Sequence, residues 1–282
     1  MNQKTTILDT ITTYIADQKN FPVLNPDAVA LQKEITGKDP DAAKIRKLIQ
    51  TDPTLTGEIL KMANSPYYKG LGEISTIKEA ALRLGQDTLF SLVVASLHKQ
   101  NFTSKTPLIK KLQARLWNHS LSCAIGTQWL ARHLKFTDLL SKAFIAGLLH
   151  DMGKLCLLSA LEKMMASENT GNTLTPVVVE KILDTLHDKQ GFLLLKQWHL
   201  PDIYCTIARD HHAQEYDMSD MLLVMVRLAN MVCGKIETGN PSEDISYIMS
   251  TSEADSLGIK ETDIALLEIA LEDAGEKLSA MR

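Results

Sequence analysis

The chain has 282 residues, of which 45% are hydrophobic and 23% charged, and its formal net charge is −4. Such a chain can bury one large core or two medium ones. Proteins that bind phosphate backbones usually carry a basic surplus, so the charge argues against nucleic-acid binding. No uninterrupted apolar run reaches the roughly 18 residues of a membrane span, and no signal-peptide layout opens the chain. We therefore expect a cytoplasmic protein that binds neither nucleic acid nor a membrane.

Helix-starting signals are clear in the first hundred residues. Asn25-Pro26, Asp39-Pro40 and Asp52-Pro53 each pair a capping side chain with a proline suited to the first helical position. Residues 76–84 and 87–97 are amphipathic at helical spacing. Alternating β-branched and aromatic residues, which would indicate strands, are nearly absent. The first part of the chain is therefore predicted to be helical.

A polar break at residues 101–107 is a candidate subdomain boundary, and longer helices are predicted after it. Loops are expected at residues 167–175 and 234–244. The predicted helices cover residues 107–134, 139–166, 177–198, 202–211, 221–232 and 262–278. The whole chain is thus predicted to be all-α.

The four cysteines are far apart in the sequence, and each is surrounded by apolar residues. They are Cys123, Cys156, Cys205 and Cys233, and no CxxC pair occurs. The spacing therefore indicates neither a zinc knuckle nor a dithiol redox site. We expect four reduced thiols in the core.

Six of the eight histidines lie on or at the ends of apolar helix faces, whereas His98 and His133 fit surface positions. His119 shares a face with Leu116 and Cys123. The face that ends in His150 consists of small residues, which would let another helix approach closely. The other histidines on such faces include His187, His211 and His212.

A single histidine on an apolar face is more often an ordinary core residue than a ligand. Several of them on successive helices are harder to explain this way, because burying many polar rings costs free energy unless each ring finds a partner. A shared metal ion would meet this need, and so would a network of water and hydrogen bonds.

Several motifs together resemble a known family. The segment Leu148–Lys154 (LLHDMGK), with Trp117-Asn118-His119-Ser120 upstream, resembles the signature of the HD superfamily of metal-dependent phosphohydrolases. From about Phe21 to Asn230 the chain is also similar to HDOD domains, the HD-related output domains of bacterial signalling proteins. The motifs that carry this second resemblance are Asp52–Leu55, Asn64–Tyr68, Ile77–Gly85 and Trp198–Pro201.

The resemblance implies a multi-helical, all-α HDOD fold. A helical N-terminal part, residues 1–105, would pack on an HD-like helical core, residues 106–235. Residues 236–282 would form a C-terminal helical extension to which no motif extends.

The resemblance also implies a divalent-metal site for Fe, Mn or Mg. The metal ligands of HD proteins fall here on His119, His150 and Asp151, and the positions of a second metal fall on His187, His211 and His212. The distant acid of the family is replaced by Asn230, a neutral and weak ligand. The GYP element of the cyclic-dinucleotide branch is absent from this sequence.

Three functions follow as expectations. The first is a non-catalytic regulatory module with a residual metal or phosphate pocket, which would bind a signalling protein or a nucleotide. The alternative is a metal-dependent phosphohydrolase acting on a nucleotide or phosphodiester, in which Asp151 and Lys154 would be the catalytic residues and Lys154 would stabilise the developing charge. The third is a scaffold whose histidines form only a polar core. The sequence leaves the ligand, the partner and the oligomeric state open.

Overall fold

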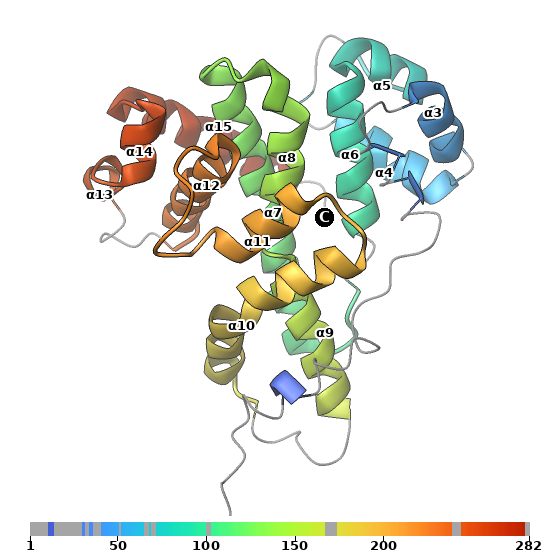
Figure 1. The fold of residues 1–282 in the computed structure, drawn as a ribbon. Coiled ribbons are helices and arrows are strands. Elements are labelled where there is room, and N and C mark those ends of the chain that lie inside the picture. Colours follow the sequence, from blue (N-terminus) through green and yellow to red (C-terminus); the bar gives the residue numbers. More distant parts are fainter. Residues whose placement is uncertain are drawn as a thin grey trace, which may run out of the picture.

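The computed structural model describes residues 11–13, 30–31, 34–35, 41–50, 52–64, 68, 72–99, 103–166, 174–238 and 244–279. These described residues form helices and contain no strand, which confirms the all-α prediction. In Figure 1 the N-terminal helices lie on one side of a central pair, α7 and α8, and the C-terminal helices lie on the other side. Helices α9 and α10 extend below this row.

The N-terminal helices begin where the sequence predicts them. The Asp52 side chain accepts a hydrogen bond from the Leu55 N–H at 3.0 Å and caps α4, and Thr76 caps α5 in the same way. Of the predicted starts, Asn25-Pro26 and Asp39-Pro40 lie outside the described residues. The helices are α3 (Ala42–Gln50), α4 (Pro53–Ala63), α5 (Ile77–Leu84) and α6 (Gln86–Lys99).

Asn64 of the family motif closes the loop between α4 and α5. Its side-chain amide donates to the Ile74 carbonyl at 2.7 Å, and its side-chain oxygen accepts from the Ile74 N–H at 2.7 Å. Ser65, Pro66 and Tyr67 of the same motif lie outside the described residues. The asparagine therefore has a structural role in this part of the fold.

The helix predicted over residues 139–166 is wrong as a single element, because the chain breaks it at His150-Asp151. The structure has α7 (Pro107–His133), a 3₁₀ turn at Thr137–Leu139, α8 (Leu140–Leu149) and α9 (Met152–Ala166). No proline marks the break. The break lies where the chain changes its packing partner, because α8 packs along α7 whereas α9 packs mainly along α10 (Pro176–Gln197).

The stretch Thr137–Ala166 is long and apolar enough to cross a membrane by composition, and its most apolar 18 residues have a mean hydropathy of 1.4. Lys142, His150-Asp151 and Lys154 interrupt this stretch, so it is not the uninterrupted apolar run that the sequence was expected to lack. In the fold, 89% of its most apolar part is buried inside the protein. A core helix has this same composition, so the finding is weak support for a membrane span.

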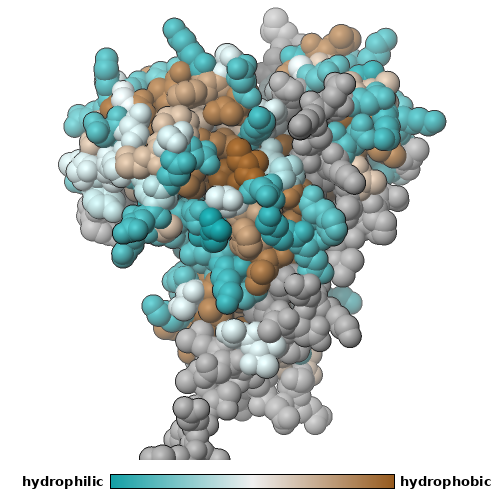
Figure 2. Space-filling view, viewed as in Figure 1, coloured by the Kyte–Doolittle hydropathy of each residue, from teal (hydrophilic) through white to brown (hydrophobic). Residues whose placement is uncertain are grey.

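The last helices are α11 (Asp202–Asp210), α12 (Met221–Thr238), α13 (Ile245–Met249), α14 (Ser252–Leu257) and α15 (Glu261–Ser279). Helix α12 continues past its predicted end at Val232, so the predicted loop from Gly234 begins too early. Buried apolar residues on α12 and α15 hold these helices against α7. The face of the molecule seen in Figure 2 is mostly hydrophilic, with apolar residues gathered near its middle.

Two glycines allow the close helix contacts on which the site depends. A Cβ atom at Gly147 would lie 2.5 Å from the Cys123 carbonyl oxygen, so α8 packs directly on the α7 backbone. A Cβ atom at Gly153 would lie 1.9 Å from the His187 carbonyl oxygen, so α9 and α10 touch through their backbones. The predicted close approach at the small-residue face before His150 is therefore confirmed.

The two histidines expected at the surface differ. His98 is 1% exposed, with its ring 5.4 Å from that of Trp198, so the prediction is wrong for this residue. The reason is that α6 is apolar on nearly all sides and is covered by its neighbours. Burial lowers the pKa of His98 to about 4. His133 is exposed as predicted, and it stacks on Trp129.

Candidate metal centre

The carboxylate of Asp151 lies at the centre of four histidines. It is 1% exposed, and its two oxygens face opposite sets of rings. Oδ1 is 3.4 Å from His187 Nε2 and 3.5 Å from His211 Nε2. Oδ2 is 3.6 Å from both His119 Nε2 and His150 Nε2. The structure thus brings together the residues that the sequence assigned to separate helices.

The three most deeply buried rings are held by the backbone. His150 Nδ1 is 2.7 Å from the Gly147 carbonyl oxygen, and His187 Nδ1 is 2.8 Å from that of Leu183. Since a carbonyl oxygen only accepts, Nδ1 must carry the proton in each ring. Nε2 then presents a lone pair toward Asp151, which is the arrangement of metal-binding histidines.

His211 follows the same pattern, with its Nδ1 3.1 Å from the Ala208 carbonyl oxygen.

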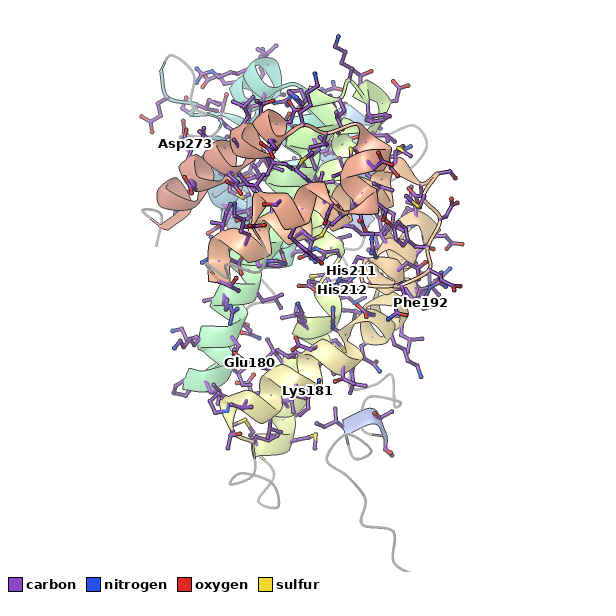
Figure 3. All side chains as sticks on the ribbon, turned by 90° about the vertical axis from the view of Figure 1, so that its left-hand side faces the viewer. Glu180, Lys181, Phe192, His211, His212 and Asp273 are labelled. Carbon is purple, nitrogen blue, oxygen red and sulfur yellow. The ribbon has the colours of Figure 1, made fainter. Side chains whose placement is uncertain are left out.

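We call His187, Asp188, His211 and His212 the inner cluster. One ligand atom from each of these four side chains lies within 4.8 Å of the others. His187 and His211 are buried, whereas His212 is exposed at the edge. Figure 3 shows His211 and His212 side by side.

Asp188 was not among the predicted ligands. Its Oδ1 lies 2.9 Å from His187 Nε2 and 3.7 Å from His211 Nε2. His187-Asp188 repeats the His-Asp order of His150-Asp151 on another helix, and this repeat is the signal that could have identified it.

The other side of Asp151 has a different set of donors. We call His119, Cys123 and His150 the pocket cluster, whose ligand atoms also lie within 4.8 Å of one another. His119 Nδ1 is 2.8 Å from Glu237 Oε1, which directs His119 Nε2 inward. Glu237 was missed because α12 was predicted to end before this residue.

The buried polar atoms at this centre fit a bound cation. His150 Nε2, Asp151 Oδ1 and Asp188 Oδ1 are buried and have no hydrogen-bond partner within the described structure. His187 Nε2 and His211 Nε2 are 3.3 Å apart, although both Nδ1 atoms already carry the ring proton. Two imidazoles on one tetrahedral ion have nitrogens about 3.3 Å apart. A metal ion would therefore satisfy atoms that otherwise repel one another.

Charge at this centre is strongly shifted. Burial opposes ionisation of Asp151, but Lys154 and then His150 outweigh it and hold the Asp151 pKa well below its ordinary value. Burial also keeps the pKa of His150 well below its ordinary value. In contrast, burial lowers the pKa of His119, but the hydrogen bond to Glu237 and the negative charges of Asp151 and Glu237 together outweigh burial and raise it. Asp151 is thus an anion beside a neutral His150, as metal binding requires.

A pocket of about 310 Å³ leads to Asp151 from the surface. Its cations are already paired: Lys154 Nζ is 2.6 Å from Asp151 Oδ2, and Arg115 is 3.6 Å from Glu180. The α12 residues that line it are Gly234, Glu237 and Thr238, whereas Asn230 lies about one turn earlier on that helix and does not line the pocket. The remaining lining comes from Leu112, Leu116, His119, Leu158, Leu183 and Asp184.

Arg227 fixes the turn that carries His211 and His212. Its guanidinium donates to the Asp210 and Ala213 carbonyl oxygens, each at 3.0 Å. It also donates to Glu253 of α14 at 2.6 Å. The end of α11 is therefore tied to α12 and α14 through one half-buried charge.

Known proteins share this fold and parts of this sequence. The profile of the HDOD domain family matches residues 21–214. An HDOD domain protein of unknown function from Geobacter sulfurreducens has a TM-score of 0.76 and 23% identity, covering 96% of this chain and 98% of that one. A provisionally assigned metal-dependent phosphohydrolase from Shewanella amazonensis has a TM-score of 0.70 and 17% identity, covering 96% and 97%.

Two relatives match by sequence. An uncharacterized protein of Treponema pallidum is 26% identical over 238 residues, which are 82% of this chain and 46% of that protein. The cyclic di-GMP phosphodiesterase CdgJ of Vibrio cholerae is 30% identical over 124 residues, 43% of this chain and 26% of that protein. The chain thus spans less than half the length of either relative. With the family profile matched over most of its helices, the chain belongs to the HDOD domain family.

Proposed function

We propose that this protein is a non-catalytic regulatory module of bacterial signalling whose helical body is held together by a divalent ion in the inner cluster. The observation that carries the proposal is the convergence of backbone-anchored imidazoles on buried carboxylate oxygens that have no other partner in the described structure. An ion there would join α10 and the end of α11 to Asp151. Imidazole nitrogens favour Fe²⁺ over Mg²⁺, and the carboxylates also allow Mn²⁺.

The charges around the pocket support a binding role over a catalytic one. Asp184 and Glu237 add negative charge to the lining, while Lys154 and Arg115 are each paired with an acid. A phosphodiester would meet little free positive charge there. In addition, Asn230 supplies no carboxylate to hold an ion and orient an attacking water.

A regulatory role needs two states of the helical body. An effector that binds one arrangement of the helices more tightly would shift the population toward it. The effector would be a nucleotide in the pocket or a cytoplasmic signalling protein at the surface. Any signal reaching α10 or α11 would also reach α6, because His98 of α6 packs on Trp198 at the end of α10.

The test is metal analysis of protein purified without oxygen, followed by a screen of nucleotides and cyclic dinucleotides with Fe²⁺, Mn²⁺ or Mg²⁺ added. We expect about one Fe²⁺ or Mn²⁺ ion per chain in the inner cluster, lower thermal stability after chelation, and no turnover. Turnover that disappears in a His150→Ala variant would overturn the non-catalytic assignment, and protein without any ion would overturn the metal site.

The second candidate is a metal-dependent phosphohydrolase acting on a nucleotide or phosphodiester. It is favoured by the pocket, which reaches Asp151 and Lys154 from the surface. The similarity to a cyclic di-GMP phosphodiesterase points the same way. A bound ion would supply a nucleophilic hydroxide, and Asp151 would hold that ion in place. Lys154 would neutralise charge on the phosphoryl oxygens. The hydrolysis screen described above distinguishes the two candidates.

A further inference from the structure

The pocket cluster contains a sulfur atom, that of Cys123. Cys123 lies one turn after His119 on α7, and its Sγ is 3.5 Å from His119 Nε2. A nitrogen and a sulfur bound to one tetrahedral zinc ion are about 3.5 Å apart, given bond lengths near 2.0 and 2.3 Å. The pair therefore already has the spacing of two zinc ligands.

A second thiol lies beside Cys123 on α12. Cys233 is 2% exposed, and after burial its thiol is the next cause that raises the pKa of Cys123. Both cysteines are reduced. The ligand atoms of His119, Cys123 and His150 thus lie within 4.8 Å of one another, and the Cys233 thiol lies next to this group.

The two imidazoles are oriented for a ligand. Each has its Nδ1 bonded outward, His119 to Glu237 and His150 to the Gly147 carbonyl oxygen. His150 Nε2 is buried, points inward and has no hydrogen-bond partner in the described structure. Outer hydrogen bonds of this kind fix the ring orientation of metal-binding histidines.

We propose that His119, His150, Cys123 and Cys233 form a second metal site, of the Cys₂His₂ type, that binds Zn²⁺ or another divalent ion with affinity for sulfur. This site shares no side chain with the inner cluster, so it stands whether or not the proposed regulatory function is correct. Binding would release the two thiol protons to solvent.

The charges favour thiolate ligands at this place. Lys154 lies beside Asp151, and its ammonium group would repel an ion that kept its full charge. Two thiolates neutralise a divalent ion, so the occupied site carries no net charge in a buried environment. Cys233 lies almost one turn beyond Asn230 on α12, so a soft ligand compensates for the missing carboxylate.

The test is cobalt substitution in the metal-free full-length protein. Co²⁺ bound by thiolates gives charge-transfer absorption in the near ultraviolet, a signature that the inner cluster cannot produce because it has no sulfur. We expect this absorption in the wild type and in a His187→Ala/His211→Ala variant, but not in Cys123→Ser or Cys233→Ser. Cys205→Ser is the matched control, because Cys205 is a buried thiol on α11 that should leave the absorption unchanged.

Zn²⁺ affinity, measured by competition, should fall more than about 100-fold in each cysteine variant. This is a larger loss than that caused by removing a residue that only hydrogen-bonds to a metal ligand. No thiolate absorption in the wild type, or absorption that survives in Cys123→Ser, would overturn the site. If the absorption is lost in Cys123→Ser but kept in Cys233→Ser, Cys233 is not a ligand. A Cys123–Cys233 disulfide detected by mass, without metal uptake, would also contradict the proposal.

If a cysteine variant does not fold, thiol alkylation of the wild type replaces it. Zn²⁺ should slow the modification of Cys123 and Cys233 and leave that of Cys205 unchanged. Equal rates with and without Zn²⁺ would refute the site. Loss of metal from the inner cluster alone would count against the proposed function and not against this inference.

Discussion

Two regions of this protein bury histidines, and they do so in different ways. Around Asp151, the Nδ1 atoms of the most buried rings bond to backbone carbonyl oxygens and the Nε2 atoms converge on a carboxylate. At the junction of α6 and α10, His98 is equally buried, but neither of its ring nitrogens has a hydrogen-bond partner in the described structure. Its neighbour is the indole of Trp198.

The difference shows which property of a buried histidine indicates a metal site. Burial is common to both regions, so it does not distinguish them. The anchoring of Nδ1, which fixes the tautomer and aims Nε2 at other acceptors, is found around Asp151 and is missing at His98. His98 therefore behaves as a neutral aromatic ring of the core, whereas the rings around Asp151 are arranged for a cation.

The largest effect is expected from removing the charge that holds the end of α11. An Arg227→Met variant leaves Glu253, which is 4% exposed, without its partner. Breaking such a buried pair costs about 3–5 kcal/mol. Urea denaturation should show this loss, and metal content should fall because the turn with His211 is released. In an Arg227→Met/Glu253→Leu variant no unpaired charge remains, so the free energy of unfolding should return toward the wild-type value. Metal content should stay low, because the hydrogen bonds from Arg227 to the turn are still missing. Wild-type stability in the single variant would contradict the role of Arg227.

Gly153→Ala should separate α9 from α10 and so break the inner cluster without touching His98. The added Cβ would lie 1.9 Å from the His187 carbonyl oxygen, and backbone must move to accept it. We expect a loss of about 3 kcal/mol in the free energy of unfolding.

The control for this substitution is Gly57→Ala on α4, where nothing lies within 4 Å of the new atom. That change should stabilise the protein by about 0.5–1 kcal/mol, since alanine favours a helix. Similar destabilisation by both substitutions would show that the close contact between α9 and α10 is not the cause.

His98 should make the protein sensitive to acid. Its pKa is about 4 in the folded state and 6.5 ordinarily, so the unfolded chain binds the proton first as the pH falls. Stability is therefore lost between pH 6.5 and pH 4, by about 2 kcal/mol at pH 5. A His98→Phe variant should lack this component in urea titrations at pH 7 and pH 5. His133→Phe, at an exposed ring, is the control and should keep it. An unchanged pH dependence in His98→Phe would contradict the assignment.

The smallest effect is expected from Glu237→Gln, which keeps the shape of the side chain and removes its charge. The hydrogen bond to His119 Nδ1 becomes weaker, so Nε2 is held less firmly toward Cys123. We expect Zn²⁺ affinity to fall about 10-fold and the free energy of unfolding to change by less than about 1 kcal/mol. Competition with a chromophoric chelator measures the first quantity. A loss of affinity equal to that of Cys123→Ser would make Glu237 a ligand itself.

Much of the site follows from patterns within single helices. The periodicity around His119, His150 and His187 shows which face of each helix is buried, and the motif Leu148–Lys154 indicates the residues that meet at Asp151. Asp52 and Thr76 start their helices through hydrogen bonds between neighbours in the chain, so these starts could be read locally. The assignment of the six ligands to a metal remains a prediction.

The sequence by itself determined the all-α class, most helix boundaries and the faces on which the histidines lie. Only the tertiary structure decided the break at His150-Asp151, the burial of His98 and the meeting of Cys123 with Cys233. Hydrophobic periodicity identifies which face of a helix is buried. It does not identify the packing partner, because any apolar surface would bury that face equally well. Which neighbour packs there depends on backbone contacts such as that of Gly153 with α10, and these form only when distant segments come together.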